Sequence, residues 1–281
     1  MRTRFGFGEN WRQFASSLEP TQILEAKQSL VRLIGTGSLL NRSFLDIGSG
    51  SGLFSLAARQ LGARVRSFDD DPESVECTNA LRHAYFREDP LWTVERGSIL
   101  DPNYVKGLGL FDVVYSWGVL HHTGAMWTAL EHAASRVCSS GLLVIALYRR
   151  TPLCWAWKIE KRIYAAAPRP IQWMIRVPYK TGLLVNKAVR GVSPLSFVRN
   201  YKSCRGMAWH HDVHDWLGGY PYESAPALTV KTEIARLGFQ ILRAQEHPVG
   251  LGLFGTGCDE YVAQRENQPV PIDAAPLAGA S

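Results

Sequence analysis

The feature that most constrains this chain is a glycine-rich stretch at residues 44–52, which reads Phe-Leu-Asp-Ile-Gly-Ser-Gly-Ser-Gly. Its apolar first half predicts a buried strand. Gly48, Gly50 and Gly52 predict a tight turn whose backbone can approach a ligand closely. Apolar residues at helical spacing follow in 53–61, so the turn opens a helix. A strand, a glycine turn and a helix form the first unit of a nucleotide-binding α/β domain.

The spacing of the glycines and the acid before them bear on which nucleotide would fit. Dinucleotide folds use Gly-x-Gly-x-x-Gly to aim a helix N-terminus at a pyrophosphate. Here the glycines alternate, and Asp46 stands just before them. A carboxylate is a poor neighbour for a pyrophosphate but suits a ligand with an ammonium group. The alternative is a solvated glycine turn that only joins strand to helix.

A second predicted strand, residues 63–69, ends in a run of acids. Asp69 lies 21 residues after Gly48, where nucleotide folds place a carboxylate that accepts hydrogen bonds from both ribose hydroxyls. The alternative is a solvated acidic turn that caps the next helix. We expect Asp69 to bind the ribose, Asp71 to cap the helix, and Asp70 to belong to the cofactor site.

Together these segments resemble the class I S-adenosylmethionine-dependent methyltransferases. The glycine loop with Asp46 resembles their motif I, which wraps the methionine half of the cofactor, and Val-x-x-Phe-Asp-x-x-Pro at 65–72 resembles their ribose-binding strand. The segment Asp-Trp-Leu-Gly-Gly-Tyr-Pro-Tyr-Glu at 215–223 resembles a bacterial, quinone-methylase-like branch. The resemblance spans most of the chain and implies S-adenosyl-L-methionine as cofactor.

The remaining strand patterns agree with the α/β fold that this resemblance implies. Apolar segments predict strands at residues 92–99, 111–117, 142–148, 239–244 and 258–263. The last two strands have no full helix between them and predict an antiparallel hairpin. We therefore expect a seven-stranded, mostly parallel Rossmann-like sheet with helices on both faces, and a helical insertion after strand five.

Further cofactor contacts are implied by the resemblance. Family members often have Gly-Asp where this chain has Gly97 and Ser98, so the Ser98 hydroxyl is expected to replace the acid that meets the adenine. Ile99 is expected on the adenine face, although it also suits an ordinary core. Ser116 and Trp117, which end the fourth strand, are expected to flank the methionine part.

Candidate proton acceptors come from two segments. His122 follows the fourth strand and can act as a base or orient the substrate, since imidazole titrates near neutral pH; it can equally pack the next helix. His210, His211 and Asp215 lie in a segment, 205–223, that concentrates histidines, acids and aromatics. We expect this segment to form the substrate-binding wall. No metal is expected, because adjacent side chains point apart and methyl transfer from a sulfonium needs none.

Residues 151–227 are too long for a loop and are predicted to be a helical insertion. Their first part, 151–205, is aromatic and basic, with Glu160 as its one acid. Such a composition suits an anionic membrane surface, an acidic substrate or RNA; equally, its helices can bury their aromatics and solvate their lysines. The expected domains are an N-terminal helical lid (1–40), a cofactor-binding core (41–150), a substrate cap (151–227), the C-terminal part of the sheet (228–266) and a disordered tail (267–281).

Composition sets broad limits. The chain is 46% apolar and 20% charged, which is typical of a globular protein, and its net charge is +6. Five scattered cysteines without Cys-x-x-Cys spacing favour a reducing compartment. No apolar run reaches the length of a membrane span, and no secretory signal is apparent. We therefore expect a cytoplasmic protein.

Three functions follow. The first is a methyltransferase acting on an O, N or C nucleophile of a small, lipid-linked or sugar-linked metabolite. The second is an RNA or protein methyltransferase that uses the basic insertion. Nucleic acid is not expected as a partner, because no RNA-binding module and no Asn-Pro-Pro-Tyr motif is present. The third is a non-catalytic cofactor-binding module. The glycine spacing disfavours an NAD-dependent oxidoreductase.

Overall fold

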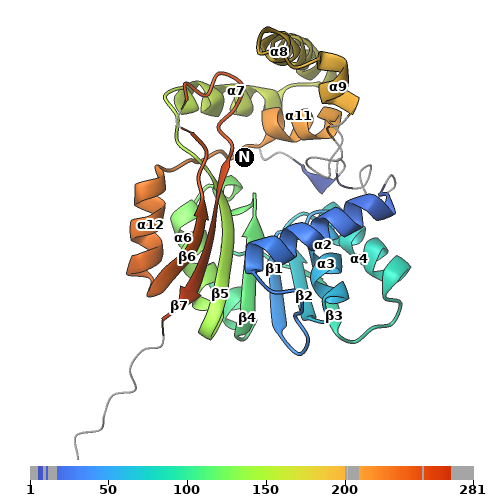
Figure 1. Cartoon of the computed structure of the whole chain (residues 1–281), viewed down its shortest axis with the longest axis vertical. Helices are drawn as coiled ribbons and strands as arrows, with labels where there is room; N and C mark the ends of the chain where they lie inside the picture. Colours follow the sequence, from blue (N-terminus) through green and yellow to red (C-terminus); the bar gives the residue numbers. More distant parts are fainter. Residues whose placement is uncertain are drawn as a thin grey trace, which may run out of the picture.

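The computed structural model describes residues 6–8, 11, 18–199, 201, 209–248 and 250–266. A seven-stranded sheet has the order β3-β2-β1-β4-β5-β7-β6 (Figure 1). The strands from β1 to β5 pair in parallel, and β7 pairs antiparallel with both β5 and β6. The predicted fold class is therefore confirmed. The strands are β1 (Ser43–Ile47), β2 (Arg64–Asp69), β3 (Trp92–Arg96), β4 (Phe111–Trp117), β5 (Val137–Tyr148), β6 (Phe239–Gln245) and β7 (Cys258–Arg265).

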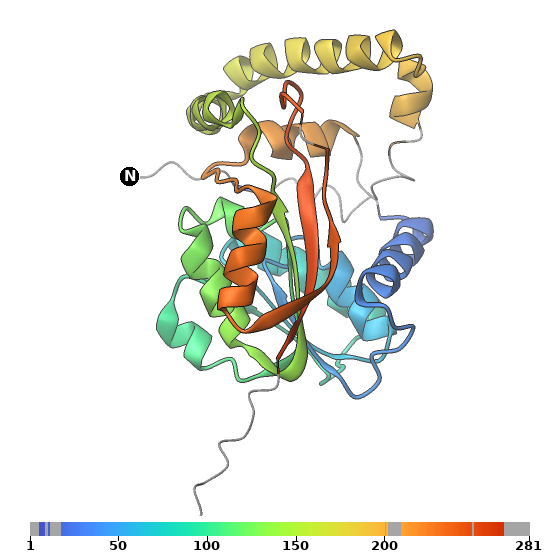
Figure 2. The same ribbon diagram turned by 60° about the vertical axis from the view of Figure 1, so that its left-hand side comes forward.

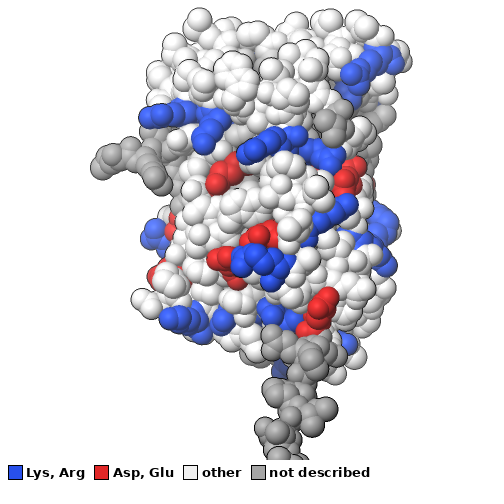
Figure 3. Space-filling model, turned by 90° about the vertical axis from the view of Figure 1, so that its left-hand side faces the viewer, with Lys and Arg blue, Asp and Glu red and all other residues white. Residues whose placement is uncertain are grey.

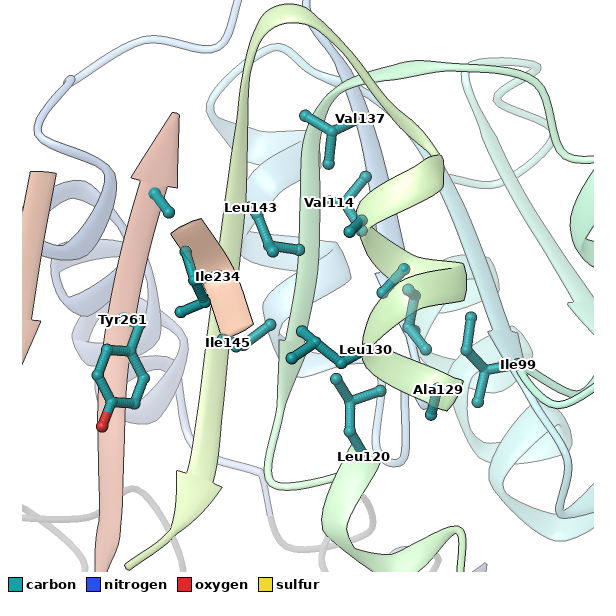
Figure 4. Packing of buried hydrophobic residues seen from close by; sticks show 14 of the residues in the cluster. Ile99, Val114, Leu120, Ala129, Leu130, Val137, Leu143, Ile145, Ile234 and Tyr261 are labelled. Atoms are coloured by element: carbon teal, nitrogen blue, oxygen red, sulfur yellow. The ribbon is translucent and has the colours of Figure 1, made fainter. Parts of the chain in front are cut away.

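Helices cover both faces of this sheet, as Figures 1 and 2 show. One face carries α2 (Pro20–Ile34), α3 (Leu53–Gln60) and α4 (Pro72–Tyr85); the other carries α5 (Pro102–Lys106), α6 (Met126–Ser135) and α12 (Ala227–Arg236). The strands serve both layers because successive side chains alternate in direction. In β1, Phe44 packs in the α2–α3 layer, whereas Leu45 and Ile47 pack in the α6–α12 layer. Figure 4 shows the second layer, with Leu130 of α6 beside Ile145 of β5.

The strand after α6 begins earlier than the sequence pattern predicts. β5 starts at Val137 rather than at residue 142, because Val137 pairs with Phe111 before the register shifts between Phe111 and Val113. Ser140 lies at the irregular point with a φ of 59°. The polar Ser139 and Ser140 hide this first half of the strand from an apolar pattern.

The insertion forms a helical layer beyond the carboxyl ends of the strands (Figures 1 and 2). Its described part comprises α7 (Cys154–Ala166), α8 (Arg169–Val189), α9 (Pro194–Arg199) and α11 (Trp209–Gly218). Tyr164 of α7 packs with Val213 and Leu217 of α11 in a small core of their own. No helix among the described residues is both long and apolar enough to cross a bilayer. The tail expected at 267–281 lies outside the described residues.

The alternative that the insertion simply buries its aromatic residues holds for only part of them. Trp157 packs on the core that surrounds Tyr164, and its Nε1–H donates to the carbonyl of Gly252. Trp155 and Trp173, by contrast, point to solvent. The structure thus leaves large aromatic side chains of α7 and α8 uncovered.

A pair of leucines tests the central packing. Leu143 of β5 is fully buried between the sheet and α6, whereas Leu242 of β6 is 49% exposed. We expect Leu143→Ala to lower the free energy of unfolding by about 2–5 kcal/mol, because the cavity adds to the lost transfer energy. Leu242→Ala should cost about 0.5 kcal/mol or less. Urea unfolding of both variants measures this, and equal losses would contradict the assigned layer.

Candidate active site

A cavity of about 1460 Å³ lies at the carboxyl edge of the sheet, beneath the helices of the insertion. The strand order reverses between β1 and β4, and the carboxyl ends of these neighbours diverge there. Open α/β sheets bind ligands at such a switch point. Loops after β1, β2, β3 and β4 form the lower part of the lining, and α8, α11 and the loop between β6 and β7 form the upper part.

The glycine loop has the backbone that the sequence predicts. Gly48, Gly50 and Gly52 have φ values of 74°, 54° and 78°, which favour glycine over other residues. A Cβ on Gly48 would lie 2.4 Å from Val119. Glycine at this position therefore lets the loop pack against Val119, and Gly52 then begins α3 as its N-cap.

Asp69 fixes this loop to its neighbour. Its Oδ2 accepts a hydrogen bond from the amide of Gly50 at 3.0 Å, and its Oδ1 accepts one from the amide of Asp71 at 3.0 Å. Asp71 in turn caps α4, since its carboxylate accepts from the amide of Glu73. The structure thus gives Asp71 the expected capping contact, and it places Asp69 and Asp70 in the cavity lining.

Two carboxyl groups at this end of the cavity have raised pKa values. Asp46 is 3% exposed, and its Oδ2 accepts from the Ser55 hydroxyl at 2.5 Å. Burial raises the pKa of Asp46 to about 7, and the negative charge of Asp69 adds to the shift. Burial also raises the pKa of Asp69 to about 6. A positively charged ligand would offset this desolvation cost, so the pair favours a cation.

The predicted adenine contacts line the same cavity. Ser98 and Ile99 follow β3 and face the space beside Asp70. The Ser98 hydroxyl accepts a weak hydrogen bond from the amide of Leu100 at 3.4 Å, so its proton remains available to a ligand. Ile99 lines the cavity and also packs in the α6 layer, so its position is compatible with both an adenine contact and a core role.

At the end of β4, the side chains of Ser116 and Trp117 point in opposite directions, although both are expected to flank the methionine part. Trp117 lines the cavity, with its Nε1–H donating to Glu260 at 3.0 Å. Ser116 is fully buried and does not line it, because its hydroxyl donates to the Ile47 carbonyl at 3.2 Å. Alternate residues of a strand face opposite sides, so Ser116 points away from Trp117. The cofactor contact expected of Ser116 stays a prediction.

The same alternation identifies a residue that the motif comparison missed. Tyr115 shares the Trp117 side of β4, lines the cavity and is 2% exposed. Its hydroxyl has no hydrogen-bond partner among the described residues. Burial raises the pKa of Tyr115 well above its ordinary value, and Asp46 adds to the shift, so the group stays a neutral donor. A period-two reading of β4 would have found it.

His122 is held in a defined tautomer. Its Nδ1 lies 2.8 Å from the carbonyl oxygen of Pro221, which can only accept, so Nδ1 carries the proton and Nε2 is the basic atom. The ring lines the cavity and lies 5.3 Å from the Phe7 ring, at an interplanar angle of 51°. The adjacent His121 is structural: it accepts from the Tyr148 amide, and burial holds its pKa well below its usual value.

The upper wall brings one more predicted residue to the cavity. Asp215 of α11 is buried and lines it together with Trp216. His210 and His211 also belong to α11, but their side chains lie outside the described residues. His214 faces elsewhere and hydrogen-bonds to Tyr164. No group of three His, Cys, Asp or Glu residues suited to a metal occurs in the described part of the chain.

Behind this wall lies a buried lysine from the basic part of the insertion. Lys161 of α7 is fully buried, and its Nζ lies 3.7 Å from the centroid of the Trp216 ring. Burial lowers the pKa of Lys161 to about 7, against the attraction of Glu160 and Asp215. The ammonium group thus supports the aromatic wall from outside the cavity.

The raised pKa of Asp46 predicts how stability depends on pH. The folded, ligand-free chain binds the proton more tightly than the unfolded chain, whose carboxyl has a pKa of 3.8. The free energy of unfolding therefore falls as pH rises from the unfolded to the folded value, by about 4 kcal/mol at 1.36 kcal/mol per unit. Asp46→Asn should remove this fall and be more stable than wild type at pH 8 but not at pH 4.

Urea unfolding at both pH values measures the difference, with Asp101→Asn as a control at an exposed helix cap. A gap between wild type and Asp46→Asn that is the same at both pH values would show that the carboxyl does not titrate as assigned.

Comparisons with known proteins agree with this geometry. A family model described as a methyltransferase domain matches residues 19–192. A ubiquinone biosynthesis O-methyltransferase of Paramagnetospirillum magneticum is 30% identical over 143 residues, or 49% of this chain and 55% of that protein. The protein of the same name from Parvibaculum lavamentivorans is 25% identical over 181 residues, or 62% and 64%. The chain spans about half the length of the first of these relatives.

Solved structures show the fold. Magnesium protoporphyrin IX methyltransferase from Synechocystis, with bound SAH, has a TM-score of 0.55 at 16% identity and covers 92% of this chain and 94% of its own. An O-methyltransferase family protein from Burkholderia thailandensis has a TM-score of 0.52 at 14% identity, with 86% and 57% covered. Because the family model matches more than half of the sequence, this chain belongs to the methyltransferase-domain family, and the predicted class I resemblance is confirmed.

Proposed function

We propose that this chain is an S-adenosylmethionine-dependent methyltransferase that acts on a small organic acceptor. The observation that carries this proposal is one continuous cavity with two unlike ends. The lower end has the glycine loop and the carboxyls of Asp46 and Asp69, and the upper end has aromatic residues with His122 and Asp215. A cofactor at the lower end would lie next to an acceptor at the upper end.

The residues at the lower end fit the cofactor. The carboxyls of Asp46 and Asp69 favour a cation, the backbone of Gly48 and Gly50 lines the cavity without side chains, and the buried Tyr115 hydroxyl offers an unused hydrogen bond. Asp69 and Asp70 would hold the ribose, Ser98 and Ile99 the adenine, and Trp117 the methionine end. When bound, S-adenosylmethionine supplies a methyl group on a positively charged sulfur that a nucleophile can displace.

The chain's own contribution is to align the nucleophile, exclude water and accept a proton. The Pro221 contact leaves Nε2 as the basic atom of His122, and the residue lines the cavity, so it can take a proton from a hydroxyl or amine. Asp215 faces the same space from α11. His210 and His211 remain candidates on the same helix.

The acceptor class follows from the upper lining. Tyr148, Tyr179, Trp216 and Phe254 offer flat apolar contacts to a ring or an apolar chain. The two relatives described above are named for ubiquinone biosynthesis, which is consistent with such an acceptor. We therefore favour an O, N or C nucleophile on a small, lipid-linked or sugar-linked metabolite over RNA or protein.

We further infer that the protein works in the cytoplasm and that its basic insertion meets an anionic partner, either a membrane surface or an acidic acceptor. Cys138 and Cys154 are free thiols, as in a reducing compartment. Nucleic acid is a weaker candidate, since exposed apolar side chains accompany the basic ones on α7 and α8.

Cofactor binding tests the lower end. Asp69→Asn keeps the size of the side chain but removes its charge and one acceptor oxygen. Calorimetric titration should show S-adenosylmethionine binding weakened about 10- to 100-fold, as expected for one or two hydrogen bonds to a charged group. Asp101→Asn, whose carboxylate caps α5 outside the cavity, is the control. Unchanged affinity in Asp69→Asn, with an unchanged melting temperature, would refute the ribose assignment.

Turnover tests the upper end. Release of S-adenosylhomocysteine is followed across a panel of catechols, hydroquinones and aromatic amines, and the best acceptor is kept. With it, His122→Gln should lower kcat about 10²- to 10⁴-fold and abolish the acidic limb of the pH profile, while leaving cofactor affinity unchanged. His83→Gln, on the exposed side of α4, is the control. Full kcat in His122→Gln would mean that the enzyme needs no base at this position.

A further inference from the structure

The outer side of the insertion is an apolar surface that no other helix or strand of the described part of the chain covers. On α7, Trp155, Ile159 and Ile163 recur every four residues and are all more than half exposed. Spacing of four residues places them in one stripe along the helix. This stripe lies opposite Tyr164 and Lys161, which face the interior.

The neighbouring helix α8 continues this surface. It is 21 residues long, yet none of its residues is buried. Met174, Val177, Val185 and Val189 follow one side of it, and Trp173 stands beside them, with exposed fractions of 59% for Trp173 and 82% for Val189. Figure 2 shows α8 as the element farthest from the sheet. Contiguous exposed apolar residues of this kind mark interaction surfaces.

The charges on these two helices have one sign. Glu160 is the one acid of α7 and α8, and both of its carboxyl oxygens are buried, which raises its pKa to about 7. Lys158 and Arg162 are exposed beside Ile159 and Ile163. Figure 3 shows the upper end of the molecule as a broad uncharged surface with Lys and Arg at its edges and acidic side chains below it. The other basic residues of the two helices are the buried Lys161 and, on α8, Arg169, Arg176, Lys180 and Lys187.

We propose that this outer surface, formed by the exposed apolar residues of α7 and α8 with their flanking basic residues, docks the protein in the plane of an anionic lipid bilayer. The apolar stripe enters the boundary between headgroups and acyl chains, and the basic residues meet the lipid phosphates. Trp155 and Trp173 suit that depth, because indole rings favour the interface. The contact is peripheral, since neither helix is apolar enough to span.

The charge pattern favours lipid over the other occupants. A second copy of the chain would bring the same positive surface against this one, which like charges oppose. RNA would pair with the basic residues but would leave the apolar stripe in water. Only an anionic bilayer complements both the charge and the apolar area.

The inner side of the same helix connects docking to the cavity. Tyr179, Leu183 and Asn186 of α8 line the cavity, whereas Val177 and Val185 face outward. A bilayer that covers the outer side would therefore hold one wall of the acceptor end in place. Docking itself does not depend on the proposed methyl transfer, so the two can fail separately.

Vesicle co-sedimentation of the full chain tests the proposal. We expect binding to vesicles of equal parts phosphatidylglycerol and phosphatidylcholine, and at least about tenfold weaker binding to phosphatidylcholine alone. Trp155→Ser combined with Trp173→Ser should weaken binding about tenfold or more. The matched control is Leu40→Ser with Leu228→Ser, which removes two equally exposed leucines from other surfaces. Circular dichroism confirms that each variant is folded.

A second pair tests the charges. Lys158→Gln with Arg162→Gln should weaken binding to the anionic vesicles about tenfold or more, at about 1 kcal/mol per basic residue, and reduce its salt dependence. Arg64→Gln with Lys106→Gln, exposed at other sites, should not. Absence of vesicle binding, or equal loss in the control pairs, would overturn the proposal. So would a lipid-free dimer that Trp155→Ser with Trp173→Ser dissociates, since a second copy would then cover the surface.

Discussion

The carboxylate of Asp69 is the contact on which the lower end of the cavity depends. It accepts backbone hydrogen bonds from Gly50 and from Asp71, and so joins the loop after β1 to the loop after β2. Asp71 extends this network, since its carboxylate caps α4 and also accepts a hydrogen bond from the amide of Gly8. One acid thus orders two loops, the start of a helix and part of the N-terminal segment. Each oxygen of this carboxylate accepts one backbone hydrogen bond and can accept a second, so the same group could also meet the ribose of the proposed cofactor.

The second constraint is electrostatic. Asp46 is buried beside Asp69, and hydrogen bonds from the hydroxyl and the backbone amide of Ser55 stabilise its charged form; the same hydroxyl also pairs with Ser67. A buried negative charge lowers the free energy of unfolding of the ligand-free chain, and a bound positive charge would raise it again. In the proposed function these two neighbouring carboxyls would select a cationic ligand, and they lie where the sheet supplies the adjacent strand ends of β1 and β2.

How much of this the sequence predicts depends on the range of the interaction. Gly48, Gly50 and the acid cap at Asp71 follow from local backbone rules, and they stand where the pattern puts them. For Ser116 the motif gives the position, and strand alternation with the contact to the Ile47 carbonyl gives the direction of its side chain. The Nδ1 contact of His122 joins residues 99 positions apart, so no local pattern could reveal which nitrogen is basic. The sequence predicts which residue types surround the cavity, and the fold determines which way each side chain points.

The insertion shows the same limit in its composition. Trp155 and Trp157 are two residues apart in one helix, yet the first is exposed and the second supports a buried core. Likewise Lys161 lies buried on Trp216, whereas Lys158 and Arg162 face solvent. A count of aromatic and basic residues therefore cannot separate a packed cap from a docking surface. The helices divide these residues between the two sides, and this division gives α8 a cavity wall on one side and an uncovered apolar surface on the other.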